Sequence, residues 1–171
     1  MASITRPDCD IAPFSPSALG IASKPQNIID YAQRLAVTET RNSLPVNLTR
    51  LEASGYLRLE DKDQVLIIDV AKVGPDYLPG HAHADTLSFE LSLFGERVFV
   101  NGGTSEYGSG VVRQYERSTA AHNTVVVDQQ DSSEVWAGFR VARRAYPVDL
   151  QIKHSNGESA IACSHNGYGR L

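Results

Sequence analysis

The chain has 171 residues, and 42% of them are hydrophobic, which is enough for one domain with a buried core. Its formal net charge is −4 and its lysine and arginine residues are scattered, so it lacks the basic face that nucleic-acid binding requires. No apolar run approaches the length of a membrane span, and the N-terminus has no signal-peptide pattern. Nucleic-acid binding and a membrane span are therefore not expected.

Residues 1–45 predict a lead-in followed by one amphipathic helix. Apolar residues recur at helical spacing over 28–36, Ser23 is a candidate N-cap, and Pro25 fits a first turn. A helix of about three turns is expected there. The remaining residues, 46–171, form the second predicted region, which is rich in strands.

Alternating and β-branched runs predict a mainly β chain. Residues 55–60 and 64–71 are typical of a hairpin, and 86–94 pairs with 97–101 across a turn at Gly95-Glu96. Residues 121–128 are expected to form a further strand. Many short strands at this spacing favour an antiparallel β-sandwich. Further strands are predicted over 135–145, 148–154 and 159–163, with Asn156-Gly157 as the turn between the last two.

No helix is expected after Pro45. Residues 102–119 are rich in Gly and Ser and predict a long loop, and loops of that length in a compact domain are usually functional or disordered. In contrast, Arg143-Arg144 is predicted to be a solvated strand edge.

Three chemically active side chains occur at alternate positions just before a predicted strand. In a strand, His81, His83 and Asp85 would share the face of the apolar residues Leu87 and Phe89. Burying the three polar groups among apolar residues without partners would be costly. Either the strand begins only near residue 86, or a metal or a hydrogen-bond network satisfies these groups.

A metal site is one reading of this segment together with two later residues. Neutral imidazoles and an oxygen ligand are what Zn²⁺ takes, and Asn101 and His122 lie at predicted strand ends. The spacing is permissive, and ordinary surface or core histidines remain an alternative. A cupin-like metal enzyme is a further alternative, although Glu90 lies further from the two histidines of 81–83 than that pattern requires.

Three motifs together resemble the heparinase II/III-like family of polysaccharide lyases. They are Gly80-His81-Ala82-His83-Ala84-Asp85-Thr86-Leu87-Ser88-Phe89, Asn101-Gly102-Gly103-Thr104-Ser105 with Tyr107, and Arg117-Ser118-Thr119-Ala120-Ala121-His122-Asn123-Thr124-Val125. The resemblance extends from about Gly55 to the C-terminus, and it includes 133–144 and 165–168.

The resemblance implies an architecture larger than this chain. Members of the family have an N-terminal α/α toroid followed by antiparallel β-sandwich domains, and they cleave uronic-acid-containing polysaccharides by β-elimination. This chain would be the sandwich part, possessing a linker to the toroid in residues 1–45 and acting on an acidic polysaccharide. The sequence itself leaves the compartment open, while the resemblance favours the bacterial periplasm.

The resemblance also implies roles for individual residues. His83 and His122 would be metal ligands, and His81 would lie near the reacting sugar. Asn101 stands where several members have a metal-binding Asp, and because an amide carries no charge it would hold zinc more weakly. Asp85 is then either a carboxylate that orients a ligand or a substitute ligand.

β-Elimination needs a base for the proton next to the carboxylate, a group that neutralises the carboxylate, and an acid for the leaving oxygen. Tyr115 is the predicted catalytic tyrosine beside His81, with Tyr107 as second choice and substrate contact. Arg113 and Arg117 could hold a carboxylate bidentately. The alternatives are a packed aromatic at Tyr115 and a structural contact at Arg117.

Two functions follow as hypotheses. In the first, the chain is the sandwich part of a lyase and is inactive without its toroid. In the second, it is a non-catalytic, metal-stabilised sandwich that binds glycan or another domain.

Overall fold

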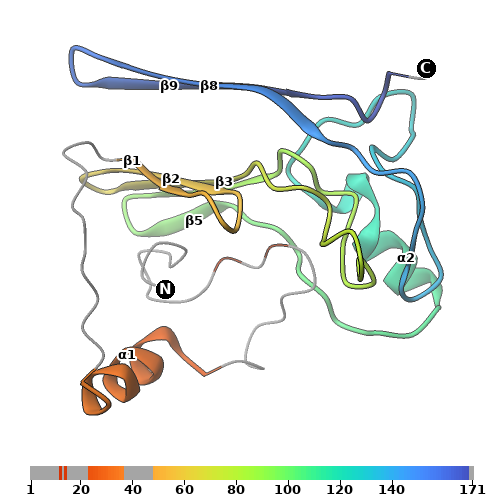
Figure 1. The fold of residues 1–171 in the computed structure, drawn as a ribbon, viewed down its shortest axis with the longest axis horizontal. Coiled ribbons are helices and arrows are strands. Elements are labelled where there is room, and N and C mark those ends of the chain that lie inside the picture. The colour runs from red at the N-terminus through yellow and green to blue at the C-terminus, as the bar shows by residue number, and fades with distance from the viewer. Residues whose placement is uncertain (1–11, 13, 15–22, 37–47, 170–171) are drawn as a thin grey trace.

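The computed structural model describes residues 12, 14, 23–36 and 48–169 (Figure 1). These residues form a mainly β structure with antiparallel sheets, as predicted. Neither α-helix of the described residues is long and apolar enough to cross a membrane. The elements are α1 (Pro25–Arg34), β1 (Leu48–Leu51), β2 (Tyr56–Asp61), β3 (Gln64–Asp69), β4 (Phe89–Leu93), β5 (Glu96–Phe99), α2 (Val111–Arg117), the 3₁₀ helix η2 (Thr119–Ala121), β6 (Val135–Trp136), β7 (Arg140–Val141), β8 (Pro147–Ser155) and β9 (Glu158–His165).

The N-terminal helix is present with shifted bounds. It begins at Pro25, which lies in the first turn as predicted, and it ends at Arg34. The predicted cap is wrong, because Lys24 is the N-cap residue and no side chain caps the helix. The predicted lead-in lies outside the described residues, apart from Ala12 and Phe14.

All three predicted hairpins are confirmed. β2 pairs with β3, β4 with β5, and β8 with β9, all antiparallel. The last turn is Asn156-Gly157, in which both residues have positive φ, as a two-residue hairpin with Asn-Gly requires. The β4–β5 turn is Phe94-Gly95, one residue earlier than predicted.

The five-stranded sheet β1-β2-β3-β4-β5 has one polar and one apolar face along β4. The face predicted to be buried is only half-buried, as at Phe89 and Leu91. The opposite face, with Glu90 and Ser92, is buried because it shares a side of the sheet with the core residues Val65 and Ile67. Phe14 and Ala12 from the N-terminal segment belong to that same core cluster.

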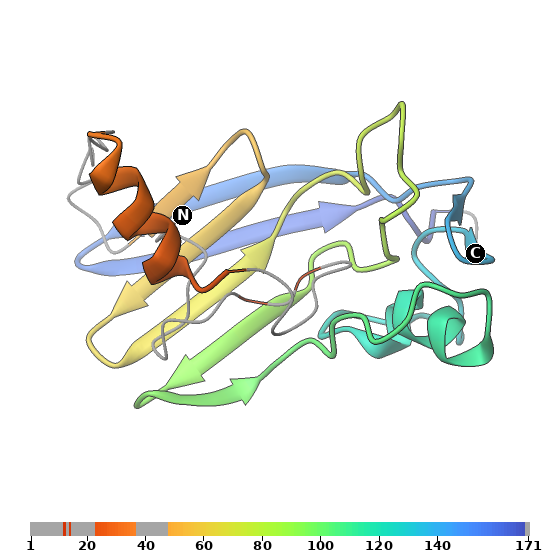
Figure 2. The ribbon, with the colours of Figure 1, turned by 90° about the horizontal axis from the view of Figure 1, so that it is seen from below.

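The apolar face of β3 and β4 looks toward the ribbon of β8 and β9. Leu66 and Leu91 line the same groove as Ile161 and Cys163 of β9. The ribbon runs along one side of the sheet in Figure 1 and crosses its strands at an angle in Figure 2. The two layers therefore face each other across this groove.

The predicted loop 102–119 contains a helix, so the prediction of no helix after Pro45 is wrong. α2 buries Arg113 and Arg117, which lie one turn apart on one face, while Val111 and Val112 are exposed. An apolar periodicity could not reveal this helix, because its buried face is made of arginine.

The predicted strand 121–128 is also wrong. η2 occupies its start, the Phe89 N–H donates to the Asn123 carbonyl at 3.3 Å, and further on there is an isolated bridge between Val127 and Gln130, closed by two residues with positive φ. Likewise, the predicted strand 135–145 is only the short pair β6 and β7.

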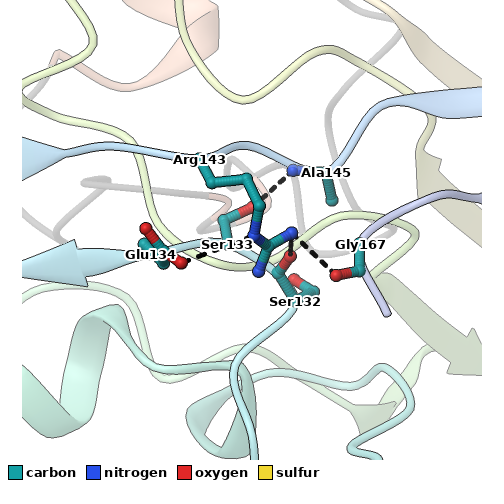
Figure 3. A network of polar contacts seen from close by, with 6 residues as sticks. All are labelled: Ser132, Ser133, Glu134, Arg143, Ala145 and Gly167. Atoms are coloured by element: carbon teal, nitrogen blue, oxygen red, sulfur yellow. Dashed lines mark hydrogen bonds and ion pairs between the residues drawn. The ribbon is translucent and has the colours of Figure 1, made fainter. Parts of the chain in front are cut away.

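Arg143 is a structural residue and not a solvated edge. Its Nη1 donates to the carbonyl oxygens of Ser132 and Gly167, at 3.3 and 2.7 Å, and its Nε lies 3.5 Å from a Glu134 oxygen (Figure 3). Ser133 Oγ accepts a bond from the Ala145 N–H in the same network. These contacts tie the end of β9 to the segment that follows η2.

Candidate functional site

Segment 81–88 has no regular secondary structure, and side chains from another part of the chain hold its backbone. Arg117 donates from Nε and Nη2 to the Ala82 carbonyl, at 3.2 and 3.0 Å. Thr119 Oγ1 donates to the Ala84 carbonyl at 2.7 Å, and Ser132 Oγ donates to the same oxygen at 3.3 Å. The Arg117-Ser118-Thr119 motif therefore positions the histidine motif.

Arg117 makes no ion pair among the described residues. Beyond Ala82, its guanidinium donates to the carbonyl oxygens of Trp136, Ala137 and Arg140 at 2.9 to 3.1 Å. The side chain has no exposed surface, and burial, followed by the charge of Arg113, lowers its pKa to about 10. It joins three segments without a counter-ion.

A linear chain of hydrogen bonds links α2 to the predicted ligands. Arg113 Nη1 lies 3.1 Å from His83 Nε2, and His83 Nδ1 lies 3.1 Å from His122 Nε2. His122 Nδ1 in turn lies 3.3 Å from Asn101 Oδ1. Asn101 therefore faces the ring nitrogen of His122 that points away from His83, and its N–H donates to Glu90 Oε1.

Three groups of this site lie close enough to hold one metal ion. The candidate ligand atoms of His83, Asp85 and His122 lie within 4.8 Å of one another, and all three side chains are buried. The 3.1 Å between His83 Nδ1 and His122 Nε2 is close to the edge of about 3.4 Å of a tetrahedral zinc site. The donor positions fit a metal. The third member of the cluster is Asp85, which was predicted as a possible substitute for the ligand Asn101.

Burial favours the neutral form of both imidazoles. It is the main cause that lowers the pKa of His83 to about 2, with the charges of His122 and Arg113 adding to it, and it also lowers the pKa of His122. A neutral imidazole is the form that coordinates metals.

A second buried carboxyl group lies near Asp85. Burial, and then the charge of Asp85, raises the pKa of Asp69 well above its ordinary value, although the Ala71 N–H bonds to it at 2.8 Å. The pKa of Tyr56 is raised by burial and by the same two carboxylates. Sequence reasoning missed Asp69, which lies at the end of a strand with no motif to mark it.

His81 occupies a different environment from His83. It is exposed, and its ring lies edge-on to Tyr107 and Phe139, with ring centroids 5.9 and 5.6 Å away. Tyr107 and Phe139 are parallel to each other to within 8°. A Cβ on Gly138 would lie 3.0 Å from a carbonyl oxygen of the 107–108 segment, so glycine permits this approach.

Of the other predicted site residues, some are exposed and some are buried. Tyr115 is 62% exposed and, at a spacing of two residues, lies on the face of α2 opposite to Arg113 and Arg117. Both arginines have no exposed surface, so neither guanidinium meets a solvent-borne carboxylate in this conformation. Of the two tyrosines, Tyr107 is the one whose ring contacts His81.

Sequence reasoning missed two residues that contact the histidines of the site. Thr104 Oγ1 accepts from Arg113 Nη1 at 3.2 Å and lies 3.4 Å from His83 Nε2. Its position in the Asn101–Ser105 motif was the available signal. Phe139 lies in the stretch 133–144, which the resemblance also includes, but only the fold brings its ring to His81.

The comparisons with known proteins agree with these motifs. The model of the family described as "Heparinase II/III-like, C-terminal" matches residues 44–171. The chain belongs to this family. The match confirms the predicted resemblance. No curated protein matches the sequence.

Three solved structures share the fold of this member of the heparinase II/III-like family. Heparan sulfate lyase HepC from Pedobacter heparinus is 18% identical with a TM-score of 0.70, and the match covers 98% of this chain and 27% of HepC. Heparinase III, the BT4657 gene product with methylated lysines, is 19% identical with a TM-score of 0.67, over 98% and 27%. A further structure of heparinase III is 15% identical with a TM-score of 0.59, over 96% and 30%. The chain thus spans under a third of these proteins.

Proposed function

We propose that this chain is the β-sandwich part of a polysaccharide lyase that cleaves uronic-acid-containing glycans by β-elimination. Family membership supports the reaction class, and one observation carries the assignment to a site: His81 is exposed while His83 and His122 beside it are buried. A solvent-facing imidazole next to a backbone carbonyl that a buried arginine holds in place is a suitable proton-transfer group.

The proposal assigns His81 to proton transfer at the sugar, with Tyr107 as a substrate contact and Tyr115 as the predicted catalytic tyrosine. The ring contact between His81 and Tyr107 supports the first two roles. The buried arginines Arg113 and Arg117 act in the proposal through the backbone and His83, because neither reaches the surface.

The remaining catalytic groups come, in this proposal, from an α/α toroid of a longer protein. The chain covers 27% of HepC, which leaves room for such a domain in relatives of this architecture. Residues 1–45 would lead to it, and 46–171 would form the sandwich. A periplasmic location and an acidic polysaccharide as substrate belong to the same proposal.

A zinc ion is proposed at His83, Asp85 and His122. When bound, zinc would carry positive charge into the buried cluster and fix segment 81–85 against the segment that follows η2. The cupin-like alternative has less support, since Glu90 is bonded to the Asn101 N–H and is not in the ligand cluster.

The lyase proposal is tested with the longest form of the protein on a panel of uronate polymers, by the absorbance of the unsaturated uronate product. Product is expected, and His81→Ala should abolish it while leaving the melting temperature within a few degrees of the parent. Absence of product across the panel would contradict lyase activity.

A second candidate is a non-catalytic, metal-stabilised sandwich that binds glycan or another domain. The observation in its favour is that the predicted ligands and both arginines are buried, as in a structural site. His83→Ala separates the two: a large loss of melting temperature with unchanged glycan binding and no activity in the parent favours the structural function.

A further inference from the structure

The contact between Arg113 and His83 has one arrangement of protons. A guanidinium is only a donor, so His83 Nε2, 3.1 Å from Arg113 Nη1, must be the acceptor. The proton of the neutral His83 ring is then on Nδ1, which donates to His122 Nε2 at 3.1 Å. The His122 proton is therefore on Nδ1 and donates to Asn101 Oδ1 at 3.3 Å.

This arrangement conflicts with coordination of a metal by His83. A metal needs a ring nitrogen with a free lone pair, and the lone pair of Nε2 is already used by Arg113. If Nδ1 coordinates, the proton of the neutral ring moves to Nε2, where its N–H would point at an N–H of Arg113. Either way, the Arg113 contact and metal coordination by His83 exclude each other.

The charges at the site also disfavour metal binding while Arg113 contacts His83. Arg113 has no ion pair among the described residues and presents its guanidinium to the site, while the ligand cluster contains a single carboxylate, Asp85. Asn101 adds an oxygen but no charge. A divalent cation would therefore enter beside a fixed positive charge with only one negative ligand.

We propose that Arg113 competes with a divalent cation for His83, and that the Arg113 side chain determines whether the cluster of His83, Asp85 and His122 takes up metal. The inference rests on the metal site of the proposed function, and it gives Arg113 a positioning role in place of the predicted substrate contact. Thr104, which accepts a bond from the same Nη1, helps to hold Arg113 on His83.

The test is a titration of the metal-free protein with Zn²⁺ against a competing chelator. Arg113→Met, which keeps an unbranched apolar stem but removes the donors, should bind Zn²⁺ at least about tenfold more tightly than the parent. Lys153→Met removes a positive charge from the exposed surface of β8 and should leave the affinity within about twofold. Adding His83→Ala to Arg113→Met should abolish the gain.

Nitrogen-15 NMR of the imidazole rings decides the question even if Arg113→Met does not fold. In the metal-free parent, His83 should show a protonated Nδ1 and an acceptor Nε2. In the zinc-saturated parent, the Arg113 Nη protons should lose their contact with His83. Equal zinc affinity in the parent and Arg113→Met, an Arg113 contact that persists with zinc bound, or no zinc binding by either protein would each overturn the inference, and none of these results bears on the lyase assay.

Discussion

Arg117 provides the strongest test of how this site is built. Its guanidinium makes five hydrogen bonds to four backbone carbonyl oxygens and none to a carboxylate. In Arg117→Lys the charge is kept, but an ammonium has at most three donors and cannot span four carbonyls in a plane. At least two charge-assisted bonds are lost, each with a net contribution of about 1.5–3 kcal/mol, so the free energy of unfolding should fall by about 3 kcal/mol or more.

The assay is equilibrium unfolding in urea, with the m-value compared between variants. The matched control is Arg140→Lys, which makes the same exchange on an exposed side chain and should change the free energy of unfolding by less than about 0.5 kcal/mol. If Arg117→Lys is as stable as this control, the carbonyl contacts do not hold segment 81–85, and the account of the motif is refuted.

The other predictions concern acid stability, backbone packing and catalysis. Because the pKa of His83 is about 2 in the folded protein and its ordinary value is 6.5, the unfolded chain alone gains this proton between those values, so stability should fall by about 1.4 kcal/mol for each pH unit below 6.5. The raised pKa of Asp69 makes stability change with pH in the opposite direction. The quantity to measure is therefore the difference between the parent and His83→Gln in the slope of the free energy of unfolding against pH. Equal slopes would contradict the lowered pKa of His83. Gly167→Ala places a Cβ 2.6 Å from a backbone oxygen and should lower stability by about 1–3 kcal/mol in thermal unfolding, whereas Gly102→Ala, with no atom within 4 Å, should not; equal melting temperatures would exclude the clash. Tyr115→Phe should lower the lyase rate at least about tenfold if Tyr115 is the catalytic tyrosine, and an unchanged rate would leave Tyr107 as the candidate.

Local patterns predicted the hairpins well because both their strands and their turns are encoded over a few residues. Residues 65–68 are apolar and mostly β-branched, and Asn156-Gly157 adopts the positive φ values that its turn demands. The helix α2 was not predicted and the segment 121–128 was wrongly predicted as a strand, for a common reason. The buried face of α2 is formed by Arg113 and Arg117 and not by apolar residues. In segment 121–128, the side chains of Asn123 and Thr124 donate hydrogen bonds to backbone oxygens in place of regular strand pairing.

By itself, the sequence determined the family, the mainly β class and the residue types of the site, since the histidine motif and the Arg117–His122 motif are present whatever the fold does with them. Only the tertiary structure decided which residues of the histidine motif are exposed and which are buried. It exposes His81 against Tyr107, buries His83 against Arg113, and gathers Asp85 with the two buried imidazoles. The physical reason is that alternate residues share a face only in a strand, and here bonds from distant side chains to the backbone keep segment 81–88 out of the sheet.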